Sequence, residues 1–159
     1  MPRFALLLAA AATALAACSS EPPTTAELLV GEWEQVGEIT ITQGGQSILI
    51  TEGEVEYDAD GTAEGELIMR FVGAPENADE YRFEATSTYA LDGNTLTDTM
   101  QSVTVTALDD SEQANQLAAL ITNSTPPGQT STSTIVSVDR KTLVMRDETT
   151  GTESTYKRE

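Results

Sequence analysis

The candidate reactive side chains of this sequence are its carboxylates and one cysteine, because it contains no histidine. Without histidine there is no Ser–His or Cys–His pair and no ordinary zinc site. The 26 acidic residues could supply a carboxylate pair for glycoside cleavage, but among so many acids some pair is always close. The stretch from Asp58 to Gly61 begins like a calcium loop, yet its glycine comes too early and Met69 takes the twelfth position. We therefore expect no enzyme, no metal site and no cofactor.

The first 17 residues predict export. Arg3 is their only charge, and the run from Phe4 to Ala17 is apolar apart from Thr13. This run is shorter than the roughly 20 residues that a membrane-spanning helix needs. A basic start, a short apolar stretch and small residues at its end are typical of a secretory signal peptide. Residues 1–17 are therefore left out of the predicted fold.

The residues around the single cysteine resemble the lipobox of bacterial lipoproteins, since Leu15, Ala16 and Ala17 precede Cys18. The resemblance implies cleavage before Cys18, a diacylglycerol on its sulfur and an acyl chain such as palmitate on its amine. Several acyl chains hold a protein firmly on a bilayer. In enteric bacteria an Asp in the next position retains a lipoprotein in the inner membrane, so Ser19 favours the periplasmic face of the outer membrane. The alternative is an ordinary signal peptide with a cysteine nearby by chance.

The chain beyond the signal peptide is strongly acidic and has the length of one domain. Seven basic and 26 acidic residues remain, a net charge of −19. This charge excludes nucleic acid as a partner, because phosphate binding needs a basic surface. Residues 18–26 include Pro22-Pro23 and predict a short tether, and residues 27–159 predict a single domain. Cys18 has no second cysteine with which to form a disulfide within the chain.

Most of that domain has the period-two pattern of β-strands with one buried face. The clearest case is Tyr81–Leu91, where odd positions are apolar or small and even positions are mostly charged or threonine. Glycine-containing turns separate the segments at short intervals, as in hairpins. The further predicted strands are 36–43, 47–51, 55–57, 67–71, 96–106, 133–138, 142–146 and 152–157.

One segment between the late strands predicts a helix, residues 110–121, with Asp110 as its N-cap. Ala114, Leu117, Ala118 and Ile121 share one face of it. Short antiparallel strands in unbroken succession favour an all-β fold, an up-and-down barrel or a sandwich. We expect the barrel, because closing the sheet removes its bare edges.

The residues Gly31-Glu32-Trp33 at the start of the first strand resemble those of the calycin superfamily, which includes the lipocalins and lipocalin-like bacterial domains. The resemblance covers about residues 28–158 through short motifs. It implies that Gly31 lets the strand bend and that Trp33 plugs one end of the barrel. It also implies that a basic residue of the last strand lies over the indole as a cation–π contact. Arg158 is the candidate for that residue, and Arg146 is the reserve.

The barrel interior is the remaining candidate site. In small barrels the interior is either filled by side chains or holds one small ligand, and large inward aromatics favour a filled or narrow interior here. We expect Gly53 to act as a bulge that resets the alternation of the third strand. The candidate cavity residues are Ile48, Ile50, Tyr57, Leu67, Met69, Phe71, Tyr81, Phe83 and Tyr89.

Two functions remain open from the sequence. The first is a lipid-anchored, lipocalin-like domain that binds a small hydrophobic ligand. The second is a non-catalytic structural or interaction lipoprotein of the cell envelope, with a filled barrel and a docking surface on residues 110–129.

Overall fold

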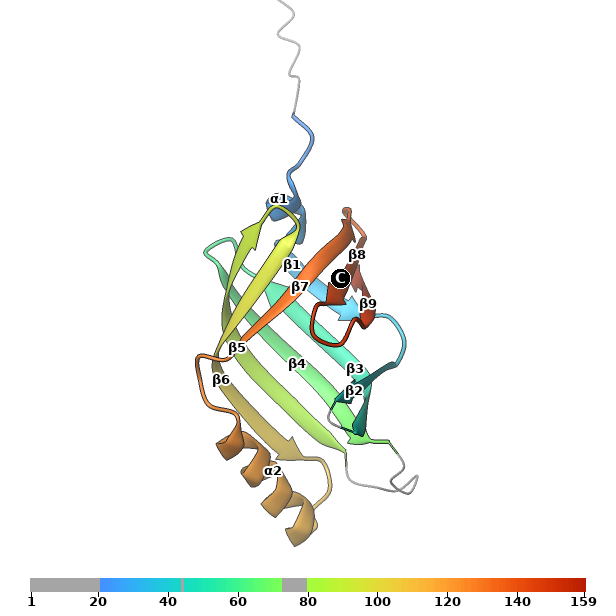
Figure 1. Ribbon diagram of the computed structural model, residues 1–159, viewed down its shortest axis with the longest axis vertical. Coiled ribbons are helices and arrows are strands. Elements are labelled where there is room, and N and C mark those ends of the chain that lie inside the picture. Colours follow the sequence, from blue (N-terminus) through green and yellow to red (C-terminus); the bar gives the residue numbers. More distant parts are fainter. Residues whose placement is uncertain (1–20, 44, 73–79) are drawn as a thin grey trace, which may run out of the picture.

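A computed structural model describes residues 21–43, 45–72 and 80–159, which form one antiparallel sheet and two helices (Figure 1). The predicted signal peptide and Cys18 lie outside the described residues. The elements, in chain order, are α1 (Thr25–Leu29), β1 (Gly31–Gln35), β2 (Ile39–Gln43), β3 (Gln46–Tyr57), β4 (Thr62–Phe71), β5 (Tyr81–Asp92), β6 (Thr95–Ala107), α2 (Glu112–Ser124), β7 (Thr130–Val138), β8 (Thr142–Asp147) and β9 (Glu153–Arg158).

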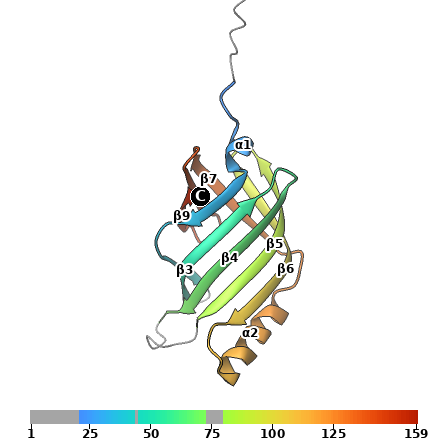
Figure 2. The same ribbon diagram turned by 180° about the vertical axis from the view of Figure 1, so that it is seen from behind.

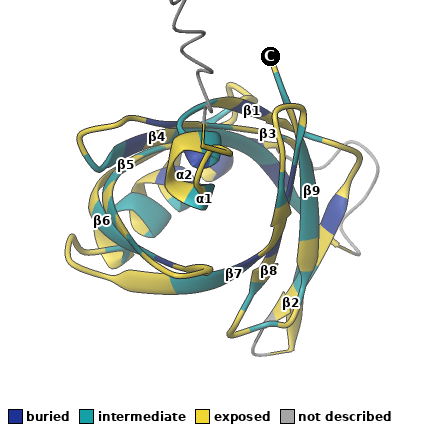
Figure 3. Ribbon diagram, turned by 90° about the horizontal axis from the view of Figure 1, so that it is seen from above, coloured by how far each residue is buried: buried dark blue, intermediate teal, exposed yellow. Residues whose placement is uncertain are grey.

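The strands close into a ring. From β3 to β9 each strand pairs with its neighbours in the chain, and β1 pairs with both β9 and β3 (Figure 3). The predicted antiparallel, mostly β architecture with a short inserted helix is confirmed. The segment predicted as one strand, 36–43, is different: only Ile39–Gln43 is a strand, and it pairs only with the first half of β3.

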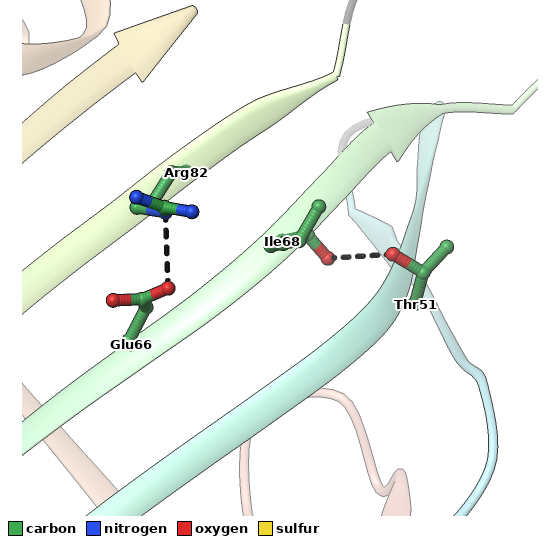
Figure 4. A network of polar contacts seen from close by, with 4 residues as sticks. All are labelled: Thr51, Glu66, Ile68 and Arg82. Atoms are coloured by element: carbon green, nitrogen blue, oxygen red, sulfur yellow. Dashed lines mark hydrogen bonds and ion pairs between the residues drawn. The ribbon is translucent and has the colours of Figure 1, made fainter. Parts of the chain in front are cut away.

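Single extra residues reset the alternation of inward and outward side chains. In β3 the pairing shifts between Ile50 and Glu52, so Thr51 is the extra residue, and its hydroxyl donates to the Ile68 carbonyl at 3.3 Å (Figure 4). The sequence had placed this bulge at Gly53. A second shift lies opposite Thr86 and Ser87, where β6 has the extra Gln101. Bulges of this kind bend a strand and re-aim its side chains.

One end of the ring is closed by α1 and the first strand. Thr24 caps α1: its hydroxyl accepts from the Glu27 backbone N–H, and the Glu27 carboxylate accepts from the Thr24 N–H. The short helix ends just before Gly31, whose φ of +127° is a conformation that side chains rarely permit. Trp33 follows and is only 1% exposed.

Trp33 and Arg158 together bind the end of α1. The indole N–H donates to the Leu29 carbonyl at 2.7 Å. The Arg158 guanidinium lies 4.2 Å from the centre of the indole ring and donates to the carbonyls of Leu28 and Val30, the latter at 2.7 Å. These donors satisfy carbonyls that the end of a helix leaves unpaired. We call this arrangement, Gly31, Trp33 and Arg158 with α1, the closed end.

The helix α2 lies at the opposite end (Figures 1 and 2). Its N-cap is Ser111, whose hydroxyl accepts from the Ala114 N–H at 3.1 Å, so the predicted cap at Asp110 is one residue early. Ala114 and Ala118 are the buried residues of α2 and pack in an apolar cluster with inward residues of β2 to β6. None of the described helices has the length and apolar character needed to cross a membrane.

Candidate functional site

A cavity of about 640 Å³ lies inside the ring. Its lining takes residues from two separate hydrophobic clusters, one behind the closed end and one beside α2. Tyr57 and Met145 belong to the first cluster, and Ile39, Ile50 and Leu67 to the second. The volume falls within the range of about 300–1,000 Å³ that is usual for small-molecule pockets. The interior is therefore open rather than filled, against the expectation from the inward aromatics.

Small inward residues at the middle of the wall explain why the interior stays open. Gly53, Gly65 and Ala85 all line the cavity. They are close in the sheet, because Gly65 pairs directly with Ala85 on the next strand, and Gly53 pairs with Leu67. Gly65 and Ala85 thus leave space in the centre, whereas the side chain of Gln35 lies against Gly53.

The cavity has one apolar and one polar wall. The apolar wall comes from β2 to β6 and includes Ile39, Ile41, Ile50, Leu67, Phe83 and Val103. The wall from β7 to β9 and their connections is mostly polar. It includes Met145 and Tyr156 beside the polar residues Gln129, Ser131, Ser133, Thr150, Thr152 and Ser154. A mostly apolar lining with a few convergent polar groups is typical of sites that bind and orient a small molecule.

A smaller recess of about 280 Å³ continues the cavity and contains Asp98. The recess shares Tyr57, Met100 and Ser131 with the larger space, among other residues. Asp98 lies in β6 between Tyr89 of β5 and Ser131 of β7. Two residues before it, the fully buried Leu96 belongs to the cluster at the closed end. Asp98 therefore marks the inner end of the cavity.

The surroundings of Asp98 favour its protonated form more than water does. Burial raises the pKa of Asp98 to about 6, and a hydrogen bond from the Ser87 side chain offsets part of this effect. After burial, the negative charge of Asp98 is the next cause that raises the pKa of Tyr57. Burial also raises the pKa of Tyr89, followed by the charges of Asp58, Asp60 and Asp98. Both phenols are therefore neutral at physiological pH.

Asp98 has no basic partner among the described residues. The one ion pair in that part of the chain joins Arg82 to Glu66 at 3.0 Å on the outer face (Figure 4). Neither the cavity nor its recess is lined by a lysine or arginine among these residues. The other inward aspartate, Asp147, accepts from the backbone N–H groups of Thr149 and Thr150 in its own turn.

The nine residues predicted for the cavity divide into two groups. Ile50, Tyr57, Leu67 and Phe83 line it. Ile48, Met69, Phe71 and Tyr81 pack in the cluster that includes Ala114 and Ala118 of α2, and Tyr89 packs in the cluster at the closed end. Tyr89 also donates to the Asp58 carbonyl at 2.6 Å, and its ring meets Tyr57 edge-on at 5.1 Å.

Sequence reasoning missed the polar part of the site. Asp98 and Met100 share the inward face of β6 with Leu96, whereas Val103 and Val105 are inward after the bulge. In the sequence of β6 the apolar residues change from even to odd positions, and this change indicates the bulge. Nothing local in the sequence shows that Gln129 and Ser131 face Asp98, because they reach it through the connection from α2.

The outer face of the sheet carries a large acidic surface. Glu54, Glu66 and Glu84 lie directly opposite one another on β3, β4 and β5, beside a groove of about 490 Å³. Partial desolvation, followed by the charges of Asp58, Glu32 and Glu64, raises the pKa of Glu56 in the neighbouring row. Within the described ranges no group of acidic side chains is arranged to hold a metal ion. The acidic side chains of this surface carry like charges and repel one another.

The aspartates of the calcium-like stretch hold a hairpin turn. One carboxylate oxygen of Asp60 accepts from the backbone N–H of Thr62 at 3.0 Å and from its hydroxyl at 2.6 Å. These bonds lower the pKa of Asp60. Gly61 has a φ of +90°, as the turn requires.

Comparison with known proteins identifies no family. No protein-family model matches the chain, and no curated protein matches its sequence. Function is therefore inferred from the cavity, the closed end and the N-terminal motif.

Proposed function

We propose that this chain is a lipid-anchored, lipocalin-like domain of the outer membrane's periplasmic face that binds one small, mainly apolar molecule inside its ring. The observation that carries the proposal is the cavity of about 640 Å³ between the two hydrophobic clusters. An unfilled interior of this size costs stability, since voids forfeit packing contacts. A bound ligand would recover these contacts.

Two further observations support the calycin relationship within this proposal. The indole of Trp33 lies beneath the Arg158 guanidinium, as the resemblance implies for barrels of that superfamily. A β-carbon on Gly31 would come within 2.2 Å of the Arg158 Nη1 atom, so the glycine and the arginine belong to one arrangement. The anchor is proposed from the Leu15–Cys18 motif alone.

The alternative, a solid barrel that docks another envelope protein, has less support. Its filled interior conflicts with the cavity volume. Its docking surface would be α2, where Leu120 is 63% exposed. A single exposed leucine is common on protein surfaces and does not form a patch.

Binding can be tested with N-phenyl-1-naphthylamine, a neutral dye that fluoresces in apolar surroundings. The protein would be the full chain carrying Cys18→Ser, which prevents acylation. We expect saturable fluorescence in this parent and at least a tenfold weaker Kd after Ala85→Phe, which fills the middle of the cavity.

The matched control is Ala90→Phe, on the same strand but on its exposed face. It introduces the same side chain without entering the cavity, so the dye affinity should stay at the parent value. An absence of saturable binding, or an equal loss in both variants, would remove the proposed function.

The anchor has a separate test. Cells that express the chain and are fed an alkyne-bearing palmitate should label the wild type but not Cys18→Ser. Unlabelled wild type in the membrane fraction would contradict the lipoprotein assignment and leave the cavity proposal standing.

A further inference from the structure

We infer that the cavity selects amphiphiles whose polar end is a protonated amine, with that amine against Asp98 and the apolar body against the wall from β2 to β6. This inference rests on the proposed function, since it names the class of ligand that the interior binds. In this inference the Asp98 carboxylate binds the ammonium group of the ligand.

The position of Asp98 gives the ligand a direction. The carboxylate lies at the inner end of the cavity, in a recess whose lining includes Ser87, Gln129 and Ser131. The large apolar side chains Ile39, Ile41 and Phe83 line the larger space beyond it. A molecule with one polar end therefore fits with that end inward.

The route to the recess follows from strand pairing. The pairing of β6 with β7 covers only Thr95–Thr99, and β2 pairs only with β3. In the described part of the chain, the edge of β2 near α2 has no strand partner, and beyond Thr99 the edge of β6 is covered only by residues 128–129 and α2. The closed end, in contrast, is sealed by Trp33 and Arg158. An elongated ligand would enter from the side of α2.

The charges of the chain favour a cation there and oppose an anion. The seven basic residues beyond Arg3 are all placed by the structure outside the lining. Arg82 contacts Glu66, Arg158 covers Trp33, and the others are Arg70, Arg140, Lys141, Arg146 and Lys157. A fatty-acid carboxylate or a lipid phosphate would meet Asp98 without a compensating charge. The net charge of −18 adds a field of the same sign.

A protonated amine would satisfy the groups that the recess presents. An ammonium has three donors and no acceptor. Carboxylate and hydroxyl oxygens on Asp98, Ser87 and Ser131 are acceptors within one recess. Burial raises the pKa of Asp98 to about 6, so the carboxylate is mostly ionised at pH 7.5. A charge-assisted hydrogen bond in such surroundings is stronger than a neutral one.

The test compares three probes of equal chain length, octylamine, octan-1-ol and octanoate, by titration calorimetry at pH 7.5. The protein is the full chain with Cys18→Ser, alone or with Asp98→Asn. The matched control is Asp92→Asn, an exposed acid at the end of β5 that changes the net charge equally. Thermal unfolding of each variant verifies that it is folded.

We expect octylamine to bind the parent about 10- to 100-fold more tightly than octanol, and octanoate to bind most weakly. Asp98→Asn should reduce the affinity for octylamine to that for octanol without weakening octanol. Asp92→Asn should preserve the preference. Equal affinities for amine and alcohol in the parent, or equal effects of the two substitutions, would overturn the inference while octanol binding upholds the proposed function. If none of the probes binds, the proposed function fails and this inference falls with it.

Discussion

The two ends of the ring are built in different ways. At the closed end a buried indole and a guanidinium bind three successive carbonyls, those of Leu28, Leu29 and Val30. At the other end α2 packs through the buried Ala114 and Ala118 and the partly buried Leu117 and Ile121. One hydrogen bond from a β6 backbone N–H to an α2 side chain, Val105 to the Thr122 hydroxyl at 3.0 Å, joins helix and strand.

The two ends therefore differ in function: the closed end stabilises the ring, and the end at α2 gives access to the cavity. Large aromatic burial with satisfied polar groups stabilises the closed end. Ala114 and Ala118 bury little area, and Leu117 and Ile121 are only partly buried, so at about 25 cal/mol per Å² the apolar contacts of α2 contribute less than those of the closed end. We therefore expect α2 to open before the ring does, which would give a ligand access to the cavity.

Trp33→Ala should have the largest effect. It removes a fully buried indole and leaves the Arg158 guanidinium without its ring. We expect the free energy of unfolding to fall by about 3–5 kcal/mol, as for other large-to-small core substitutions. Urea unfolding followed by circular dichroism measures it. A loss below about 1 kcal/mol would show that the closed end does not hold the ring.

Arg158→Met should be next, with a loss of about 2–4 kcal/mol, because it leaves the Leu28 and Val30 carbonyls without their donor. Methionine keeps the apolar part of the side chain over the indole. The control Lys157→Met changes an exposed neighbour on the same strand and should have almost no effect. Similar losses in both variants would contradict the assigned role.

Asp98→Asn should stabilise the protein by on the order of 2 kcal/mol at pH 7.5. The folded pKa of about 6 lies above the ordinary value of 3.8, so between these values the folded chain binds more protons than the unfolded chain. The free energy of unfolding of the parent should therefore fall as the pH rises from about 4 to about 6. Tyr57 and Tyr89, which face Asp98, stay neutral throughout this range.

The measurement for Asp98 is the difference between variant and parent in urea midpoints at pH 7.5 and pH 4.5. Repulsion among the acidic side chains of the outer face also decreases in acid. This effect is the same in variant and parent, so it cancels in the difference between them. The stabilisation by Asp98→Asn should be larger at pH 7.5. An equal stabilisation by Asp98→Asn at pH 7.5 and at pH 4.5 would mean that Asp98 titrates normally and faces water.

Ser111→Ala should have the smallest effect, about 1 kcal/mol, because it removes the N-cap of α2. Hydrogen exchange should become faster in the amides of α2 while the amides of β3 to β5 keep their rates. If hydrogen exchange became faster in α2 and in β3 to β5 together, α2 would unfold with the ring and not before it. That result would contradict the proposed entry side.

Much of the fold could be predicted from local sequence patterns. The alternation in β5 and the glycine turns at Gly61 and Gly93 each depend on neighbouring residues alone, so they are readable without knowing the fold. The bulge in β3 was placed at Gly53 instead of Thr51, because a glycine is a local clue while register is set by the partner strand. The N-cap of α2 was displaced by one residue for a similar reason, since Asp110 and Ser111 both suit it.

The site was harder to predict than the fold. Four of the nine predicted residues line the cavity, because inward orientation follows from alternation. Whether an inward residue lines a space or fills one depends on what lies opposite, and here Gly65 faces Ala85 across strands. Asp98 was missed because a carboxylate in a threonine-rich strand looks like a solvent-facing residue until the bulge at Gln101 is placed.

The acidic charge, the lack of histidine chemistry, the lipobox-like motif and the succession of antiparallel strands can all be read from the sequence. These follow from composition and from the period-two geometry of the chain, which needs no partner. The folded arrangement is needed to see that β1 closes the ring on β3 and that the interior holds a cavity. It also shows that Asp98 lies at the inner end of this cavity without a basic neighbour among the described residues. Those outcomes depend on side chains from strands far apart in the sequence, and their distances are set when the ring closes.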